Sequence, residues 1–176
     1  MQVKLNKKIK YRESFRPFAP SVLREDVSDY FELDDESPYM LFVEKVNGER
    51  CNISHVQAEL EKYHGNMLEI VKQKRSDIPA VTHVDYSARI QTVTAEKNPY
   101  YYGVIKEFKK QTGYSVIVNT SFNVRGEPIV CTPRNAYECF MRTEMDALVL
   151  ENCILYKEEQ PSYEGQDDWR ELYPLD

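Results

Sequence analysis

Residues 115–128 read Ser-Val-Ile-Val-Asn-Thr-Ser-Phe-Asn-Val-Arg-Gly-Glu-Pro, and they join the strongest strand signal of the chain to a long polar motif. Residues 115–118 form a short run, bounded on both sides, in which residues 116–118 are β-branched, and this is typical of a buried strand. The end of such a strand is a favoured position for ligands in α/β sheets. Ser121 and Asn123 could hydrogen-bond phosphate oxygens, and Arg125 could neutralise their charge. Spacing alone leaves a ligand site and an ordinary loop equally open. Because the chain has no P-loop and no Gly-x-Gly-x-x-Gly motif, a nucleotide would need another binding mode.

Helix and strand signals alternate on both sides of this stretch, without a regular β-α-β repeat. Ser21 could cap a short helix, Thr132 and Pro133 are a typical helix start, and Gly113 is a typical helix end. The expected helices cover residues 22–30, 54–75, 99–111 and the segment from 133 onward. The expected strands cover residues 40–46, 79–82, 88–93, 115–118, 147–150 and 153–156. This alternation predicts an α/β (α+β) fold with a twisted mixed sheet flanked by helices.

The composition is that of an acidic domain of ordinary size. The 176 residues are enough for one domain with a full core. We expect a cytoplasmic protein without a membrane segment, because no apolar run could cross a bilayer and the first residues lack the apolar core of a signal peptide. The net charge of −6 disfavours general nucleic-acid binding, which depends on a surplus of Lys and Arg. The four cysteines have no metal-ligand spacing, so we interpret them as reduced thiols and expect no protein-bound metal.

Two further polar clusters could bind an anion. Lys10 and Arg12 are two residues apart, so an extended backbone would point both to one face, where they could clamp a phosphate or carboxylate near Arg16. The competing interpretation is a solvated basic arm, which spacing alone favours. In the other cluster, Arg89 could bind an anion with His83 as a polar neighbour. A surface hairpin with a capped turn is the competing interpretation there, and spacing alone favours it slightly.

Three stretches of the chain resemble the C-terminal domain of NodU/CmcH-type O-carbamoyltransferases. The first is Lys-Tyr-Arg-Glu-Ser-Phe-Arg-Pro-Phe-Ala-Pro at 10–20. The second is Pro-Ala-Val-Thr-His-Val-Asp at 79–85, with Ala-Arg-Ile-Gln-Thr at 88–92. The third is Asn-Thr-Ser-Phe-Asn-Val-Arg-Gly-Glu-Pro-Ile-Val at 119–130, and the resemblance extends over residues 8–157. One departure is Tyr86, which stands where the family often has Gly.

The resemblance implies a YrdC-like fold with an open concave ligand face, related to threonylcarbamoyl-AMP synthase. Lys-x-Arg and Ser-x-Asn pairs mark that wider fold, and Lys10/Arg12 and Ser121/Asn123 match them. The implied activity is the ATP-dependent conversion of carbamoyl phosphate to carbamoyl-adenylate, with release of phosphate and pyrophosphate and with Mg²⁺ accompanying ATP. The implied nucleotide-binding residues are Lys10, Arg12, Arg16, Ser121, Asn123 and Arg125. The implied catalytic residues are Lys10, Arg12, His83, Arg89 and Arg125. Their cations would neutralise phosphates and developing charge, and His83 would lie beside the carbamoyl group.

Members of this family carry an actin-like ATPase-fold domain before the matching one, and that domain delivers the carbamoyl group to an acceptor hydroxyl. We therefore expect residues 1–157 to be the YrdC-like domain, residues 158–176 to be a polar acidic extension, and a separate actin-like ATPase-fold subunit to bind the acceptor. Two alternatives remain. The chain could be a non-catalytic nucleotide-binding or regulatory module that pairs with a carbamoyltransferase partner, or a binder of double-stranded RNA, which the net charge of −6 disfavours.

Overall fold

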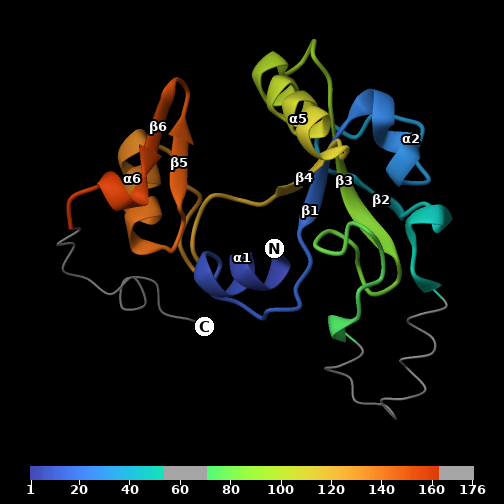
Figure 1. Ribbon diagram of the computed structural model, residues 1–176, viewed down its shortest axis with the longest axis horizontal. Coiled ribbons are helices and arrows are strands. Elements are labelled where there is room, and N and C mark those ends of the chain that lie inside the picture. Colours follow the sequence, from blue (N-terminus) through green and yellow to red (C-terminus); the bar gives the residue numbers. More distant parts are fainter. Residues whose placement is uncertain (54–70, 163–176) are drawn as a thin grey trace. The chain divides into compact units, whose positions relative to one another are not determined.

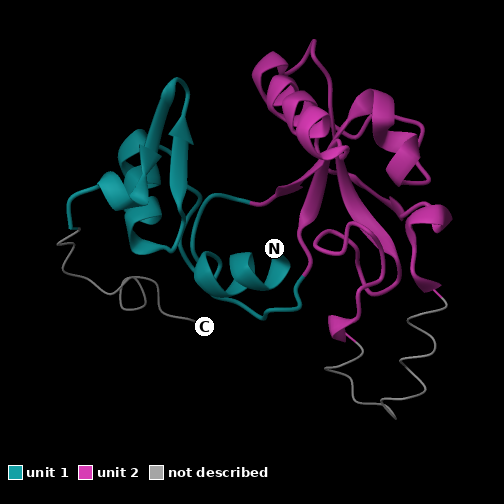
Figure 2. Ribbon diagram, viewed as in Figure 1, with its two compact units in different colours: residues 1–16, 121–176 teal, residues 17–120 magenta. Residues whose placement is uncertain are grey.

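The computed structural model describes residues 1–53 and 71–162, which form two compact units (Figures 1 and 2). One unit comprises residues 17–120, and the other combines residues 1–16 with the chain from residue 121 onward. The first contains a four-stranded sheet and the second a two-stranded sheet. Within the described residues, no helix is both long and apolar enough to cross a membrane.

The four-stranded sheet is mixed, as the alternating pattern predicts. Its strands are β1 (Ala19–Leu23), β2 (Phe42–Lys45), β3 (Ser87–Val93) and β4 (Val116–Asn119). Their order is β2-β3-β1-β4, as Figure 1 shows. The two central strands, β1 and β3, run parallel, and each edge strand is antiparallel to its neighbour. The predicted α+β class with a mixed sheet is therefore confirmed.

The two faces of this sheet differ in chemistry. On one face, Val22 and Ile90 are fully buried, as expected for a packed core. On the other face, helix α5 (Pro99–Thr112) buries its Ile105 against Leu23 of β1 and Val93 of β3. The helix begins at Pro99, where the side chain of Asn98 accepts a hydrogen bond from the backbone N–H of Tyr101, and it ends at Gly113 with φ +82°. The start and end signals in the sequence predicted this helix.

Away from α5, the same face of the sheet is polar. Side chains alternate along a strand, so Arg89 and Gln91 share the face of Val93. Ser21 Oγ and Asn119 Nδ2 both donate to Gln91 Oε1, each at 2.6 Å. Ser21, Gln91 and Asn119, one from each of three strands, form what we call the polar row. Ser21 is fully buried, whereas Gln91 and Asn119 are half-buried, so beyond the helix this face presents polar groups with which a ligand can form hydrogen bonds.

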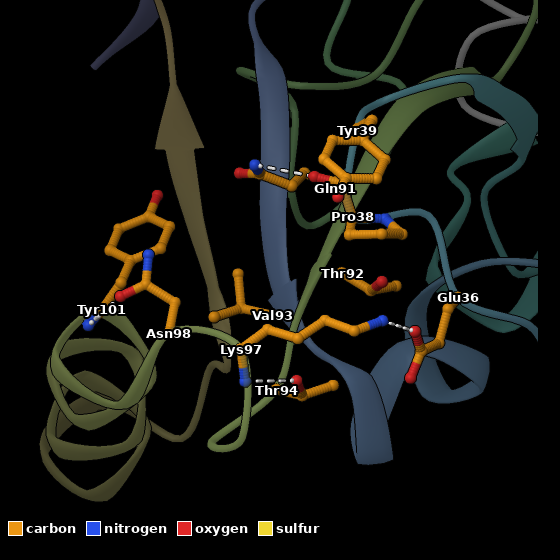
Figure 3. A pocket seen from close by; sticks show the side chains of 10 residues that line it. All are labelled: Glu36, Pro38, Tyr39, Gln91, Thr92, Val93, Thr94, Lys97, Asn98 and Tyr101. Atoms are coloured by element: carbon orange, nitrogen blue, oxygen red, sulfur yellow. Dashed lines mark hydrogen bonds and ion pairs between the residues drawn. The ribbon is translucent and has the colours of Figure 1, made fainter.

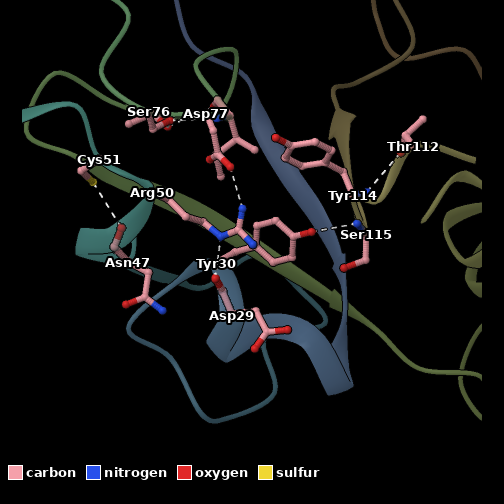
Figure 4. A network of polar contacts seen from close by, with 12 residues as sticks. Asp29, Tyr30, Asn47, Arg50, Cys51, Ser76, Asp77, Thr112, Tyr114 and Ser115 are labelled. Carbon is pink, nitrogen blue, oxygen red and sulfur yellow. Dashed lines mark hydrogen bonds and ion pairs between the residues drawn. The ribbon is translucent and has the colours of Figure 1, made fainter. Parts of the chain in front are cut away.

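A stacked arginine ties together the segments that pack against the sheet (Figure 4). The short helix α2 (Val27–Tyr30) follows a 3-10 turn, η1 (Arg24–Asp26), and supplies the buried ring of Tyr30. The guanidinium of Arg50, in η2 (Gly48–Arg50), lies 4.0 Å from the centroid of that ring and 2.6 Å from Asp77 Oδ2. The Tyr30 hydroxyl in turn accepts a hydrogen bond from the backbone N–H of Ser115, at 3.0 Å. These contacts fix the start of β4 within this unit.

The other unit is built from short elements of helix and strand. They are α1 (Gln2–Lys8), α6 (Pro133–Arg142), β5 (Ala147–Leu150), β6 (Cys153–Tyr156) and the 3-10 turn η3 (Lys157–Glu159). Strands β5 and β6 pair antiparallel, and Leu148 packs with Phe140 and Ala136 of α6. Thr132 caps α6 by accepting from the backbone N–H of Asn135 at 3.1 Å. Both strands and the start of α6 lie where the sequence predicted them.

Three expectations about local structure are wrong. Ser21 does not cap a helix, because residues 19–23 form β1 and all five are buried, so pairing with β3 and β4 overrides the local signal. Residues 79–82 form a turn instead of a strand, because Thr82 Oγ1 and the N–H of Val81 both donate to the carbonyl of Ile78. Residues 1–12 are not a solvated arm, since they contain α1 and the buried side chains of Asn6 and Lys10. The expected helix at 54–75 falls largely outside the described residues.

Candidate functional site

Lys10 joins the first basic motif to the polar motif after β4. Its side chain is 6% exposed, and its backbone follows α1 directly. The ammonium Nζ lies 2.9 Å from the carbonyl oxygen of Ser121 and 3.2 Å from Ser121 Oγ. It also lies 2.8 Å from the carbonyl oxygen and 2.7 Å from Oδ1 of Asn123. Two segments more than 100 residues apart are thus held together by one cation.

The environment of this lysine is unusual because all four partner oxygens are formally neutral. Burial, with a smaller contribution from the Arg12 guanidinium, lowers the pKa of Lys10 to about 8. The backbone there is not the extended segment expected from the sequence, because Tyr11 between the two cations has φ +47°. Lys10 therefore points into the protein, toward the Ser121–Asn123 loop.

Glu127 closes the loop that Lys10 holds. Ser121 Oγ donates to Asn123 Oδ1 at 2.7 Å, and Asn123 Nδ2 donates to the carbonyl of Glu127 at 2.7 Å. The Glu127 carboxylate accepts from the backbone N–H of Val124 at 2.8 Å. Gly126, with φ +80°, supplies the left-handed turn between them. The amide and hydroxyl groups of the motif are thus fixed in orientation before any ligand binds.

Asn6 organises the basic segment that follows α1. It is fully buried, and its Oδ1 accepts from Arg12 Nε at 2.7 Å. Its Nδ2 donates to the carbonyl of Arg16 at 2.8 Å and to that of Ser14 at 3.3 Å. Burial, followed by the Arg16 guanidinium, lowers the pKa of Arg12. One amide side chain therefore fixes the path of residues 12–16.

Positive charge surrounds Glu13 in this unit. Arg16 Nη1 lies 3.8 Å from the Glu13 carboxylate. The pKa of Glu13 is lowered first by a hydrogen bond from its own backbone N–H, and then by Arg16, Arg125 and Arg12 in that order. Three guanidinium groups near one exposed carboxylate leave an excess of positive charge, which suits a polyanionic ligand.

His83 and Arg89 belong to the other unit. His83 Nδ1 lies 2.9 Å from Ser87 Oγ, and that hydroxyl lies 2.6 Å from Asp85 Oδ1. The pKa of His83 is lowered by burial and by the charge of Arg89, against the opposing effect of Asp85. Arg89 is exposed on β3, on the face that carries the polar row. These residues form a hydrogen-bonded turn with a neutral imidazole and a nearby cation.

The predicted site residues therefore fall into two groups. One unit brings together Lys10, Arg12, Arg16, Ser121, Asn123 and Arg125, and the other brings together His83 and Arg89. Sequence reasoning missed Asn6, Glu127 and Ser87, which position the first group and His83. Glu127 stood inside the quoted motif at 119–130, Ser87 lies between the quoted stretches at 79–85 and 88–92, and Asn6 carries no spacing signal. In the part of the chain that the structure describes, no group of three or more His, Cys, Asp or Glu side chains could hold a metal ion.

Comparisons with known proteins concern the family of the chain. The family model for the carbamoyltransferase C-terminus matches residues 1–157. An uncharacterized protein of Synechocystis sp. is 58% identical over 177 residues, which cover 100% of this chain and 28% of that protein. Nodulation protein NolO of Bradyrhizobium diazoefficiens is 39% identical over 172 residues, 96% of this chain and 26% of that protein.

An enzyme with a stated activity is also among the relatives. A 3′-hydroxymethylcephem-O-carbamoyltransferase of Amycolatopsis lactamdurans is 35% identical over 122 residues, 69% of this chain and 18% of that enzyme. The chain spans less than a third of the length of each of these relatives. The match over residues 1–157 shows that the chain belongs to the carbamoyltransferase family and corresponds to the C-terminal domain of its members.

Proposed function

We propose that this chain converts carbamoyl phosphate to carbamoyl-adenylate with ATP. Carbamoyl phosphate and water give carbamate and phosphate, and a carbamate oxygen then bonds to the α-phosphorus of ATP as the bond to pyrophosphate breaks. The family supports a carbamoyltransferase role. The adenylate step is our inference from the paired Lys-x-Arg and Ser-x-Asn motifs, which meet at the ammonium of Lys10. That meeting is the observation on which the proposal depends.

Each group of site residues has a distinct part in the proposed reaction. Arg12, Arg16 and Arg125 would bind the phosphates, because their guanidinium groups give the region around Glu13 its excess positive charge. Ser121 and Asn123 would present their polar groups to the same phosphates, held in place by Lys10 and Glu127. A fixed set of donors and charges costs no reorganisation as charge develops in the transition state.

His83 and Arg89 would act on the carbamoyl group and its phosphate. Neutral His83 offers one ring nitrogen for a substrate hydrogen bond, and exposed Arg89 offers a cation near enough to lower the pKa of that histidine. Mg²⁺ would neutralise phosphate charge, and it would be held mainly by the triphosphate and water.

Delivery of the carbamoyl group would need a second protein surface. The relatives that this chain matches are three or more times its length, and one of them is an O-carbamoyltransferase that acts on a cephem hydroxymethyl group. We propose that an actin-like ATPase-fold subunit or domain binds the acceptor and receives the carbamoyl group from the adenylate.

The test is ATP–pyrophosphate exchange that depends on carbamoyl phosphate. We expect exchange with the wild-type chain, and a loss of at least a hundredfold in Arg125→Ala, because removing one fixed donor that faces developing charge costs about 10²–10³ in rate. Arg134→Ala is the matched control, since this arginine of the same unit is exposed and, among the described residues, its ion-pair partner is Glu138 one turn along α6. Absence of exchange both with the chain alone and with an added acceptor-binding subunit would contradict the proposal.

One observation favours the alternative of a non-catalytic nucleotide-binding module. Three ammonium hydrogens face four protein oxygens at Lys10, so this cation is already satisfied by the protein. Calorimetry and the exchange assay together separate the two proposals. A non-catalytic module would bind ATP in the calorimeter, but pyrophosphate exchange would stay at background even with carbamoyl phosphate and the acceptor-binding subunit both present.

A further inference from the structure

The outer edge of β2 is open over part of its length. In an antiparallel ladder, every second residue directs its backbone N–H and C=O at the neighbouring strand, and the residues between direct theirs away. The N–H of Val46 donates to the carbonyl of Tyr86 in the register of β2 with β3, so Leu41 and Val43 direct their backbone groups away from β3. Among the described residues, these outward groups have no hydrogen-bond partner. An edge of this kind can pair with another strand.

Two features limit the open stretch to residues 41–43. At one end, Glu32 donates its backbone N–H to the carbonyl of Lys45 at 2.8 Å and covers the edge there. At the other end, Met40 has φ +58°, so the chain before it turns away from the strand. This turn carries Tyr39 and forms one wall of a pocket of about 440 Å³ at the end of β3 (Figure 3).

The side chains of the open stretch are apolar and exposed. Leu41 is 78% exposed, Phe42 45% and Val43 52%. Edge strands usually carry a charged side chain, a Pro or a bulge that prevents pairing. Residues 41–43 contain neither a charge nor a Pro, and the register of β2 with β3 runs without a bulge. An apolar edge with free backbone groups and no protection indicates that another strand covers it.

We infer that β2 of a second copy of this chain pairs antiparallel with this edge, across a two-fold axis at Phe42. Leu41 of each copy then lies opposite Val43 of the partner subunit, and their outward N–H and C=O groups form four backbone hydrogen bonds. The two Phe42 rings form a cross-strand pair on one face, and the Leu41 and Val43 side chains pack on the other. This pairing satisfies every backbone group that points outward from Leu41 and Val43.

The charges beside the open stretch favour this register. Glu44 would lie opposite the partner's Met40, and Lys45 opposite the partner's Tyr39, so no like charges meet. An axis at Glu44 would set two carboxylates against each other. An axis at Val43 would bring the partner strand against Lys45, whose carbonyl is already occupied. Because the open stretch is complementary to itself about the proposed axis, a second copy fits it without any further feature.

The size of the contact sets the expected strength of the dimer. With three residues from each copy, the pairing buries less than the roughly 1,200 Å² at which stable interfaces begin. We therefore expect a reversible dimer with a dissociation constant between about 10 µM and about 1 mM. Sedimentation equilibrium of the full chain over that range of concentration should show the mean mass rising from that of one chain toward that of two.

Two substitutions should weaken the dimer while leaving the fold intact. Val43→Pro removes an N–H that has no partner within the described residues, and edge strands tolerate Pro. Because two of the four hydrogen bonds are lost, the dissociation constant should rise by about tenfold or more. Leu41→Asp should have an effect of similar size, because it sets a carboxylate against the partner's Val43. Urea denaturation shows whether each variant is folded, and Leu41→Asp decides the test if Val43→Pro is not.

Val104→Asp is the matched control for Leu41→Asp. Val104 is an exposed apolar residue of α5 in the same unit, and the substitution changes the net charge by the same amount. We expect Val104→Asp to dimerise as the wild type does. A wild-type chain that stays monomeric at the highest concentration would overturn the inference and leave this edge to a strand of a different protein. An equal loss in Val104→Asp and Leu41→Asp would overturn it as well.

Cysteine cross-linking tests the register itself. The Cα atoms of an antiparallel pair without hydrogen bonds lie about 4.5 Å apart, within the range of a disulfide. In a chain whose exposed Cys131 and Cys153 are replaced by Ser, Phe42→Cys should form a disulfide-linked dimer, with oxidised glutathione accepting the two electrons. Glu44→Cys is the control on the same strand face, because its two copies would be offset by about 13 Å along the strands. Cross-linking of Glu44→Cys as fast as that of Phe42→Cys would overturn the proposed axis.

Discussion

His83 Nδ1 and Ser87 Oγ lie 2.9 Å apart, and the only hydrogen of that hydroxyl is directed at Asp85 Oδ1, 2.6 Å away. An ionised carboxylate can only accept, so the hydroxyl donates to Asp85 and its oxygen accepts from His83. The hydrogen of the imidazole therefore sits on Nδ1, and Nε2 carries the free lone pair. In the proposed reaction, Nε2 is the atom that would face a donor of the substrate, such as the carbamoyl N–H₂.

These hydrogen bonds and charges predict how substitutions of neighbouring residues change the pKa and the tautomer of His83. Asp85→Asn removes a charge that raises the pKa of His83, so that pKa should fall. Arg89→Ala removes a charge that lowers it, so the pKa should rise. Ser87→Ala removes the acceptor of the Nδ1 hydrogen, so the Nε2–H form should appear. Nitrogen-15 NMR of the imidazole measures both the pKa and the tautomer.

Ser87→Thr is the matched control, because it keeps the hydroxyl. A wild-type protein with the imidazole hydrogen on Nε2 would contradict the hydrogen bonds assigned to His83, Ser87 and Asp85. A rise of the His83 pKa in Asp85→Asn, or a fall in Arg89→Ala, would contradict them as well. Lys45 also faces this turn through Asp85, at 3.7 Å, and stays unchanged in all four variants.

The sequence predicted the polar motifs better than it predicted what holds them. Helix α5 and strands β5 and β6 follow from local caps and apolar patterns, and the structure confirms them. The polar row could not be predicted from the sequence, because Ser21 and Gln91 become neighbours through the parallel pairing of β1 with β3, and no local pattern encodes that pairing. Asn6 was missed for a similar reason, since a lone buried amide has no period or motif. Local sequence patterns identify the polar motifs, but the pairing of distant segments determines which polar side chains contact one another.

Lys10 should give the protein an unusual pH dependence of stability. In the folded protein the pKa of Lys10 is about 8, against 10.5 for an unperturbed lysine. Between these values the unfolded chain binds a proton that the folded chain has released, so the free energy of unfolding should rise with pH over that window. Urea denaturation from pH 7.5 to 10 measures the slope, with Lys10→Met as the reference that lacks the titrating group. Parallel pH profiles for wild type and Lys10→Met would contradict the lowered pKa.

Ser115→Ala should leave stability unchanged or increase it. The Ser115 hydroxyl is buried at the start of β4 and has no hydrogen-bond partner among the described residues. A buried polar group without a partner costs about 1–3 kcal/mol, and a methyl group fits the same space. The backbone N–H of Ser115 keeps its bond to Tyr30, which Tyr30→Phe removes. Tyr30→Phe should therefore destabilise by about 1–2 kcal/mol in the same urea assay, and a larger loss in Ser115→Ala than in Tyr30→Phe would refute this account.

Tyr86 should tolerate glycine better than alanine. It has φ +64°, a left-handed conformation in the turn just before β3, which costs a residue with a Cβ about 1–2 kcal/mol. Its backbone cannot relax easily, because its N–H donates to the carbonyl of His83 and its carbonyl accepts from the N–H of Val46. Tyr86→Gly and Tyr86→Ala both lose the ring, so the difference between them isolates the backbone. We expect the glycine variant to be the more stable by about 1 kcal/mol in urea denaturation.

Gly103 in α5 provides the opposite case within the same unit. No atom lies within 4 Å of a Cβ built there, so Gly103→Ala should stabilise the helix by about 1 kcal/mol. The order of glycine and alanine is therefore expected to reverse between the two positions. If alanine were also the more stable residue at position 86, the turn would not need its left-handed backbone.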